Sequence, residues 1–101
     1  MPVQVRHIQY VIAAADQGSF RRAAAALGVQ ESAISRRIRE LEERLGTVFF
    51  IRTPNGVTLT NAGKQFVQRG RKALTEIGLA RAEAAIVDLD ARGALREVAG
   101  L

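Results

Sequence analysis

The stretch from Ser19 to Gly46 constrains the fold more than any other part of the chain. Ser19 is of the type that caps helix N-termini, and apolar side chains then recur at helical spacing up to Leu27. Gly28 follows at the point where a helix would end in a left-handed residue. A second apolar stripe begins after Gln30 and comprises Ile34, Ile38, Leu41 and Leu45. The stretch therefore predicts two helices joined by a tight turn, which is a helix-turn-helix.

Polar side chains lie on the opposite side of the second predicted helix. Ser32, Arg36 and Arg39 are there with Ser35 beside them, and the arginines come before a run of glutamates. The positive end of this helix is therefore its N-terminal end, the part that meets base edges when a helix-turn-helix enters the major groove of DNA. Alternatively, the arginines are solvated and paired with acids four positions away, such as Arg39 with Glu43. We favour DNA because Ser35 and Arg36 lie away from most of these acids.

Two further segments complete a small domain over residues 1–60. Residues 4–16 carry an apolar stripe, which predicts a first amphipathic helix whose partner is the helix-turn-helix. Two β-branched or aromatic runs, 48–51 and 57–59, flank the turn sequence Thr53-Pro54-Asn55-Gly56 and predict a β-hairpin, or wing. Arg52, at the base of the wing, either reaches a DNA phosphate or is a solvated strand end. The expected fold is mainly α: a winged helix-turn-helix with a three-helix core and a two-stranded wing.

Residues 61–92 predict one long helix after a Thr60 cap. Its seam alternates steps of four and three through Phe66, Gly70, Ala73, Ile77, Ala80, Ala84 and Val87. Such a rod would be about 45 Å long, whereas a 60-residue domain is only about 25 to 30 Å across. We therefore expect self-pairing through Phe66, Ala73, Ile77, Ala80, Ala84 and Val87; packing against a missing domain is the alternative. Residues 93–101 are expected to be a disordered tail, a short helical piece or the start of an effector domain.

Composition and charge narrow the function classes. Lys plus Arg number 15 against 10 Asp plus Glu, and this net charge of +5 favours a polyanionic partner. Arg21 and Arg22, in the first turn of the shorter helix, face either a phosphate or solvent. With no Cys, one histidine (His7) and no convergent carboxylates, we expect no metal, no cofactor and no enzymatic activity. No apolar run approaches the roughly 20 residues of a membrane span, and we expect a cytoplasmic protein.

Several short motifs occur in order along the chain. They are Gly18-Ser19-Phe20, Ala23-Ala24 with Leu27, Ala33-Ile34-Ser35-Arg36 with Ile38, Leu41-Glu42, Leu45-Gly46, Phe49-Phe50 with Arg52, Leu59-Thr60 and Ala62-Gly63. Together they resemble the N-terminal DNA-binding domain of LysR-type transcriptional regulators, over nearly the whole chain. The resemblance implies a winged helix-turn-helix that binds promoter DNA as a dimer or tetramer, with linker helices paired antiparallel. It also implies DNA contacts from Ser35, Arg36 and Arg52.

The chain departs from the family pattern at the start of the second helix of the motif. Where the family usually has a hydroxyl residue followed by Gln-Pro, this sequence has Gln30, Glu31 and Ser32. A glutamate cannot donate to adenine or guanine edges, but it can accept from cytosine N4 or repel a phosphate. We expect this copy to read DNA differently from its relatives at these positions.

These observations predict the DNA-binding module of a bacterial transcription regulator. It would bind double-stranded DNA sequence-specifically as a homodimer on an inverted repeat, and a longer parent could be a tetramer. The residues expected to contact DNA are Glu31, Ser32, Ser35, Arg36, Arg39 and Arg52. A small-molecule effector is expected to act only through a domain absent from this chain. The alternative is a protein-interaction module that uses the long helix and binds no DNA.

Overall fold

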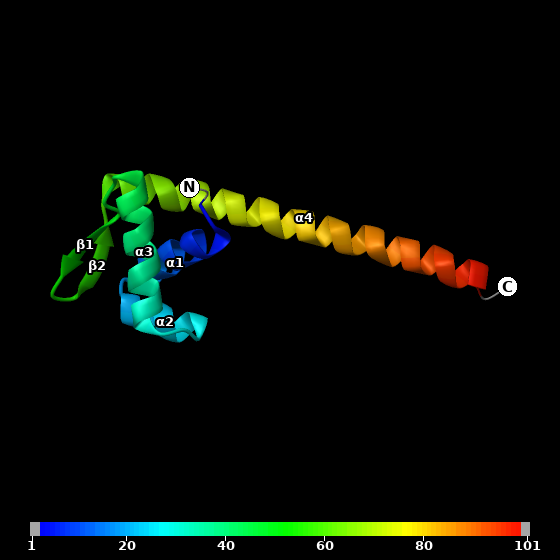
Figure 1. The fold of residues 1–101 in the computed structure, drawn as a ribbon, viewed down its shortest axis with the longest axis horizontal. Helices are drawn as coiled ribbons and strands as arrows, with labels where there is room; N and C mark the ends of the chain where they lie inside the picture. Colours follow the sequence, from blue (N-terminus) through cyan, green and yellow to red (C-terminus); the bar gives the residue numbers. More distant parts are fainter. Residues whose placement is uncertain (1–2, 100–101) are drawn as a thin grey trace.

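The computed structural model describes residues 3–99, with side chains described as far as Ala80. Its elements, in order, are α1 (Val5–Gln17), α2 (Phe20–Leu27), α3 (Glu31–Leu45), β1 (Phe50–Thr53), β2 (Gly56–Leu59) and α4 (Asn61–Ala99). Figure 1 shows α1, α2 and α3 packed together, the hairpin beside α3, and α4 extending away from all of them. The predicted fold class, a winged helix-turn-helix followed by a long helix, is confirmed.

Local capping explains where the short helices begin and end. The Ser19 hydroxyl accepts a hydrogen bond from the Arg22 backbone N–H at 3.2 Å and so caps the start of α2. At the other end of α2, Gly28 adopts φ 68°, a left-handed conformation that residues with a Cβ rarely adopt. This turn ends α2 and leads the chain into α3. The Thr60 hydroxyl caps α4 by accepting from the Gly63 N–H at 3.0 Å. The helix-turn-helix is therefore encoded locally, at its caps.

The core lies where the inner faces of α1, α2 and α3 meet. Val11, Ile34 and Leu41 are completely buried there. The apolar stripe predicted for α3 is only partly internal, because Leu45 is 46% exposed, and Leu27 at the end of α2 is 42% exposed. Both leucines are the last residues of their helices. At those positions the helix has already passed the edge of the three-helix core.

The wing contacts the rest of the domain at the Gly18 carbonyl and at the Phe20 ring. Its strands pair antiparallel with Phe50 opposite Leu59 and Arg52 opposite Val57. The Val57 N–H donates to the Gly18 carbonyl oxygen at 3.0 Å, and a Cβ on Gly56 would overlap that same carbonyl. The rings of Phe20 and Phe50 pack edge to face, with their centroids 5.4 Å apart. The hairpin is therefore held close to the start of α2.

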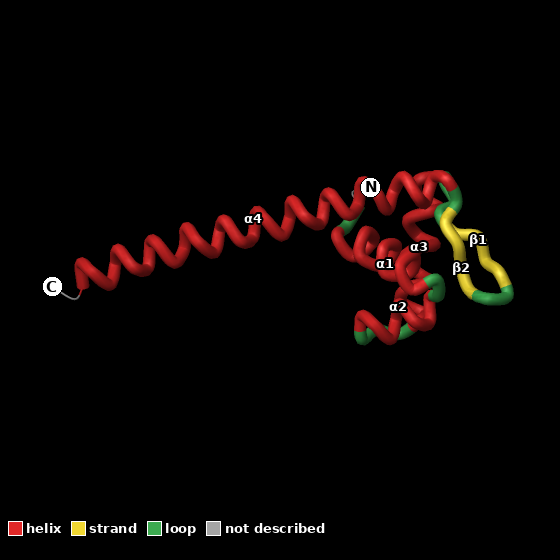
Figure 2. Tube along the Cα trace, turned by 180° about the vertical axis from the view of Figure 1, so that it is seen from behind, coloured by secondary structure: helices red, strands yellow, loops and turns green. Residues whose placement is uncertain are grey.

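Helix α4 packs on the domain with only its first part. It runs beside α1, and a Cβ added to Gly70 would lie 2.8 Å from the Ile8 side chain. The rest projects outward, and the chain measures 68 × 25 × 20 Å along its principal axes. Figure 2 shows the same projection from behind. Helix α4 continues without a break to Ala99, beyond residue 92, where the sequence predicts its end. Gly93 costs only about 1 kcal/mol of helix propensity, and the residues around it are good helix formers.

Candidate nucleic-acid interface

The start of α3 presents the polar face that the sequence predicts. Glu31, Ser32, Arg36 and Arg39 are exposed and Ser35 is half-buried, while the opposite face of the helix is buried in the core. Gln30 precedes the helix in extended conformation, and the Ser32 hydroxyl donates to its side-chain oxygen at 3.5 Å. Burial of one side of α3 in the domain thus leaves the other side, with its hydroxyl and guanidinium groups, open to a partner.

The ion pair formed on α3 does not involve Arg36 or Arg39, the two arginines of this helix that are predicted to contact DNA. Arg37 lies 3.8 Å from the Glu40 carboxylate. Within residues 3–80, Arg36 and Arg39 have no acidic partner within ion-pair distance, so the alternative pairing of Arg39 with Glu43 is not formed. Neutralising a cation in advance weakens its attraction for phosphate. Two predicted contact residues therefore keep their full charge for a partner.

A small cleft joins the start of α3 to the wing. It encloses about 250 Å³ and is lined by Ser19, Phe20, Glu31, Arg52, Thr53, Pro54, Gly56 and Val57. Arg52, on β1, extends over the ring of Phe20 with its guanidinium carbon 5.1 Å from the ring centroid. Residues separated by more than twenty positions, Glu31 and Arg52, thus line one surface. Arg52 is exposed at this position, with its guanidinium over the Phe20 ring.

Two residues that position this surface were not predicted from the sequence to do so. The Glu42 carboxylate accepts hydrogen bonds from the backbone N–H groups of Phe49, at 2.7 Å, and Phe50, at 3.4 Å. It therefore ties the end of α3 to the start of the wing. Phe20 belonged to the predicted apolar stripe, and nothing in its local sequence signals that Arg52 lies across it. Both roles depend on contacts between residues distant in the sequence.

His7 is a core residue of α1. It is 1% exposed, and its Nδ1 accepts from the Gln4 backbone N–H at 3.0 Å, while Nε2 has no partner in the described part of the chain. Burial lowers the pKa of His7 below its usual 6.5; Arg37 and Arg44 lower it as well, and Glu40 opposes them. Among the described residues there is no group of three His, Asp or Glu side chains suited to a metal ion. In the same part of the chain, no helix is both long and apolar enough to cross a membrane.

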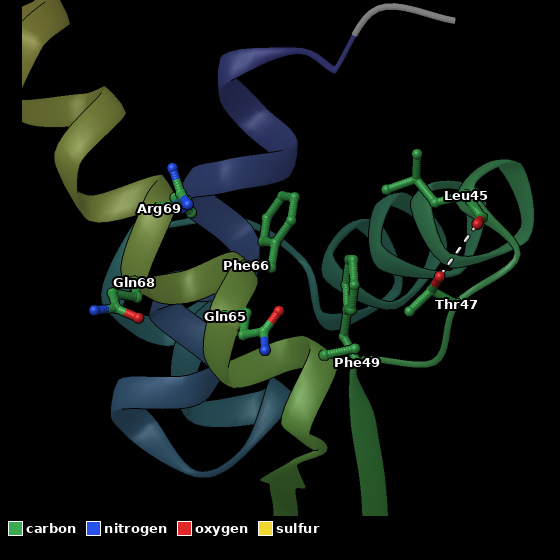
Figure 3. A pocket seen from close by; sticks show the side chains of 8 residues that line it. Leu45, Thr47, Phe49, Gln65, Phe66, Gln68 and Arg69 are labelled. Carbon is green, nitrogen blue, oxygen red and sulfur yellow. Dashed lines mark hydrogen bonds between the residues drawn. The ribbon is translucent and has the colours of Figure 1, made fainter.

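The predicted pairing residues lie along α4 with different exposures. Phe66 is half-buried because its ring stacks on Phe49 of the same chain, with centroids 4.7 Å apart, as Figure 3 shows. Ala73 and Ile77 are half-buried and Ala80 is exposed. The side chains of Ala84 and Val87 lie outside the described part of the structure.

Two hollows flank this part of α4. The larger, about 690 Å³, is lined by Leu45, Thr47, Phe49, Ala62, Gln65, Phe66, Gln68 and Arg69. The smaller, about 230 Å³, is mostly apolar and is lined by Val3, Ile8, Phe66, Arg69, Gly70 and Ala73. Phe66 and Arg69 border both. The surface beside the domain-bound part of α4 is therefore hollowed on both sides of these two residues, and it is mostly apolar only in the smaller hollow.

A short helix, a turn, a second helix with an open basic face and a pinned hairpin together define a winged helix-turn-helix domain, here continued by a long helix. The sequence model of the lysR family of bacterial regulatory helix-turn-helix proteins matches residues 5–64. The chain belongs to this family.

Known relatives and solved structures agree with this assignment. The chain is 36% identical over 96 residues to YnfL, an uncharacterized HTH-type transcriptional regulator of Escherichia coli, covering 95% of this chain and 32% of that protein. The fold of the present chain matches that of the BenM DNA-binding domain in complex with catB site 1 DNA, with a TM-score of 0.81. The identity is 29%, and the match covers 84% of this chain and 96% of the BenM chain. The CbnR DNA-binding domain bound to DNA matches with a TM-score of 0.77 and 35% identity, over 83% and 99%.

Proposed function

We propose that this chain is the module through which a LysR-type transcription regulator binds double-stranded DNA sequence-specifically. The observation that carries the proposal is the open polar face at the start of α3, where Arg36 and Arg39 have no acidic partner within residues 3–80. The likeness to BenM and CbnR domains that were crystallised with DNA supports it. DNA is also the kind of polyanion that a net charge of +5 favours.

The proposed mechanism separates positioning from reading. Arg52 beside the cleft contacts backbone phosphate and fixes the register of the domain on the duplex. With the start of α3 in the major groove, Ser32, Ser35 and Arg36 face base edges and Arg39 follows along the groove. Glu31 accepts from the N4 amino group of a cytosine. The departure from the family pattern at Gln30, Glu31 and Ser32 then changes which bases are preferred.

The proposal includes a homodimer held by α4. The helix has 39 residues and is therefore about 58 Å long, of which only the first part packs on its own domain. The half-buried and exposed positions Ala73, Ile77 and Ala80, continued by Ala84 and Val87, would pair with a second copy together with Phe66. A two-fold dimer presents two reading helices and so recognises an inverted repeat. In a longer parent protein, with an effector-binding domain, the assembly would be a tetramer in the cytoplasm.

Selection of bound sequences from a random duplex library tests the proposal. We expect enrichment of an inverted repeat, with affinity for random duplex falling steeply as salt rises, because phosphate contacts release counterions. Absence of binding to any duplex at low salt would contradict DNA recognition and favour a protein-interaction module built on α4. Enrichment of a single half-site without symmetry would contradict the dimer alone.

A further inference from the structure

The wing and the helix-turn-helix touch through a cation and an aromatic ring. The guanidinium carbon of Arg52 lies 5.1 Å from the centroid of the Phe20 ring. Phe20 is the first residue of α2 and is only 7% exposed, whereas Arg52 is an exposed residue of β1. Arg52 is thus an exposed cation whose side chain rests on a buried platform.

The platform is itself rigidly held. The Phe20 ring meets the Phe50 ring edge-on, at an interplanar angle of 87°. Arg52 is opposite Val57 in the hairpin, and Val57 donates to the Gly18 carbonyl, two residues before Phe20. The Phe20 ring and the strand that pairs with Arg52 are therefore both attached to the backbone at residues 18–20. Rearrangement of one without the other would break this network.

A guanidinium that lies over an aromatic ring keeps the N–H edges that point away from the ring free. Those edges can donate two parallel hydrogen bonds to the oxygens of a phosphate. A free arginine loses rotamer entropy when it binds, and a stacked one has already lost part of it. A ring that fixes Arg52 before binding therefore favours the complex without touching DNA.

We propose that Phe20 is a positioning residue for DNA binding, holding the Arg52 guanidinium beside the cleft with its edges open to one backbone phosphate. The inference rests on the proposed function. Glu31 lines the same cleft, so the phosphate contact is made next to the start of the recognition helix and sets the register of that helix in the groove. Phe20 thereby affects base reading from inside the domain.

A double-mutant cycle on the full chain tests the coupling. Phe20→Leu should weaken duplex binding about three-fold when Arg52 is present, in keeping with an exposed cation–π contact, and should have almost no effect in an Arg52→Ala background. Phe20→Tyr keeps a ring face and should bind as the original chain does. Because Phe20→Leu also removes core packing, Phe49→Leu is the matched control: Phe49 is 3% exposed, and its ring stacks on Phe66 of α4. Its effect on binding should be the same with and without Arg52.

A second readout needs no DNA. In the NMR spectrum of the free chain, the Arg52 side-chain protons should show an upfield ring-current shift that is lost in Phe20→Leu and kept in Phe20→Tyr. Absence of that shift would overturn the inference, as would equal losses from Phe20→Leu in both Arg52 backgrounds. Those additive losses leave the proposed function standing. Failure of the unsubstituted chain to bind any duplex would overturn both together.

Discussion

The winged domain and the projecting part of α4 differ in where their apolar side chains are covered. In the domain, Ile34 and Leu41 are completely buried by other parts of the same chain. Farther along α4, Ile77 is only half-buried, Leu79 is 52% exposed and Ala80 is exposed. A helix gains most of its stability from packing, so the domain supplies its own stabilisation and the projecting helix needs another surface. Under the proposed function, the winged domain reads DNA and the projecting part of α4 holds two copies together.

The sharpest way to break this comparison is to place a charge on the seam of α4. Ile77→Glu should raise the dimer dissociation constant by more than about 10-fold, because it places an unpaired charge in the seam and symmetry counts the cost twice. Sedimentation equilibrium measures it, and Glu76→Gln, at an exposed neighbouring position, is the control. The thermal unfolding of the winged domain should change little. An unchanged dimer constant would indicate that the seam packs against another domain instead.

A substitution in the core of the winged domain tests the other side of the comparison. Ile34→Ala should reduce the free energy of unfolding by about 2 to 5 kcal/mol, since it leaves a cavity where no solvent reaches. Urea unfolding followed by circular dichroism gives the value. Leu27→Ala, with 42% of the side chain already exposed, should cost clearly less. Equal losses at the two positions would refute the core described for the domain.

A smaller effect separates two neighbouring arginines of α3. Arg36→Ala should weaken specific binding by about 1 to 3 kcal/mol and relax base preference at one position. Arg37→Ala is the matched control, because Arg37 already pairs with Glu40 and its loss should leave the selected sequence unchanged. Fluorescence anisotropy and repeated library selection measure both. If the two variants behave alike, Arg36 is a general phosphate contact and does not read bases.

The smallest expected effect is a loss of stability at acidic pH that comes from His7. Because the pKa of His7 in the fold lies below the unfolded value of 6.5, the unfolded chain binds more protons in the interval between the two values. The contribution of neutral His7 to the free energy of unfolding is fully present above pH 6.5. It is lost as the pH falls through 6.5 towards the lowered pKa. Unfolding measured in urea from about pH 8 to about pH 5 should show this slope. His7→Asn, which keeps an acceptor for the Gln4 N–H but does not titrate, should remove it.

Most of the fold could be predicted from the sequence because it is encoded locally. The cap at Ser19, the turn at Gly28 and the hairpin signal around Asn55 each specify a backbone conformation from a few neighbouring residues. The exposed face of α3 followed directly from helical spacing, so Ser32, Arg36 and Arg39 were placed correctly on the surface. The end of α4 was not, because a single glycine is a weak stop signal within a run of good helix formers.

By itself, the sequence determined which segments are helices, where the wing turns and which side of α3 is polar, since helical period and capping act over short distances. Only the tertiary structure decided that Arg52 lies on Phe20, that Glu42 holds the start of the wing and that Phe66 stacks on Phe49 of its own chain. These contacts join residues that no local pattern links. They exist because packing three helices and a hairpin around one core brings distant side chains to the same place.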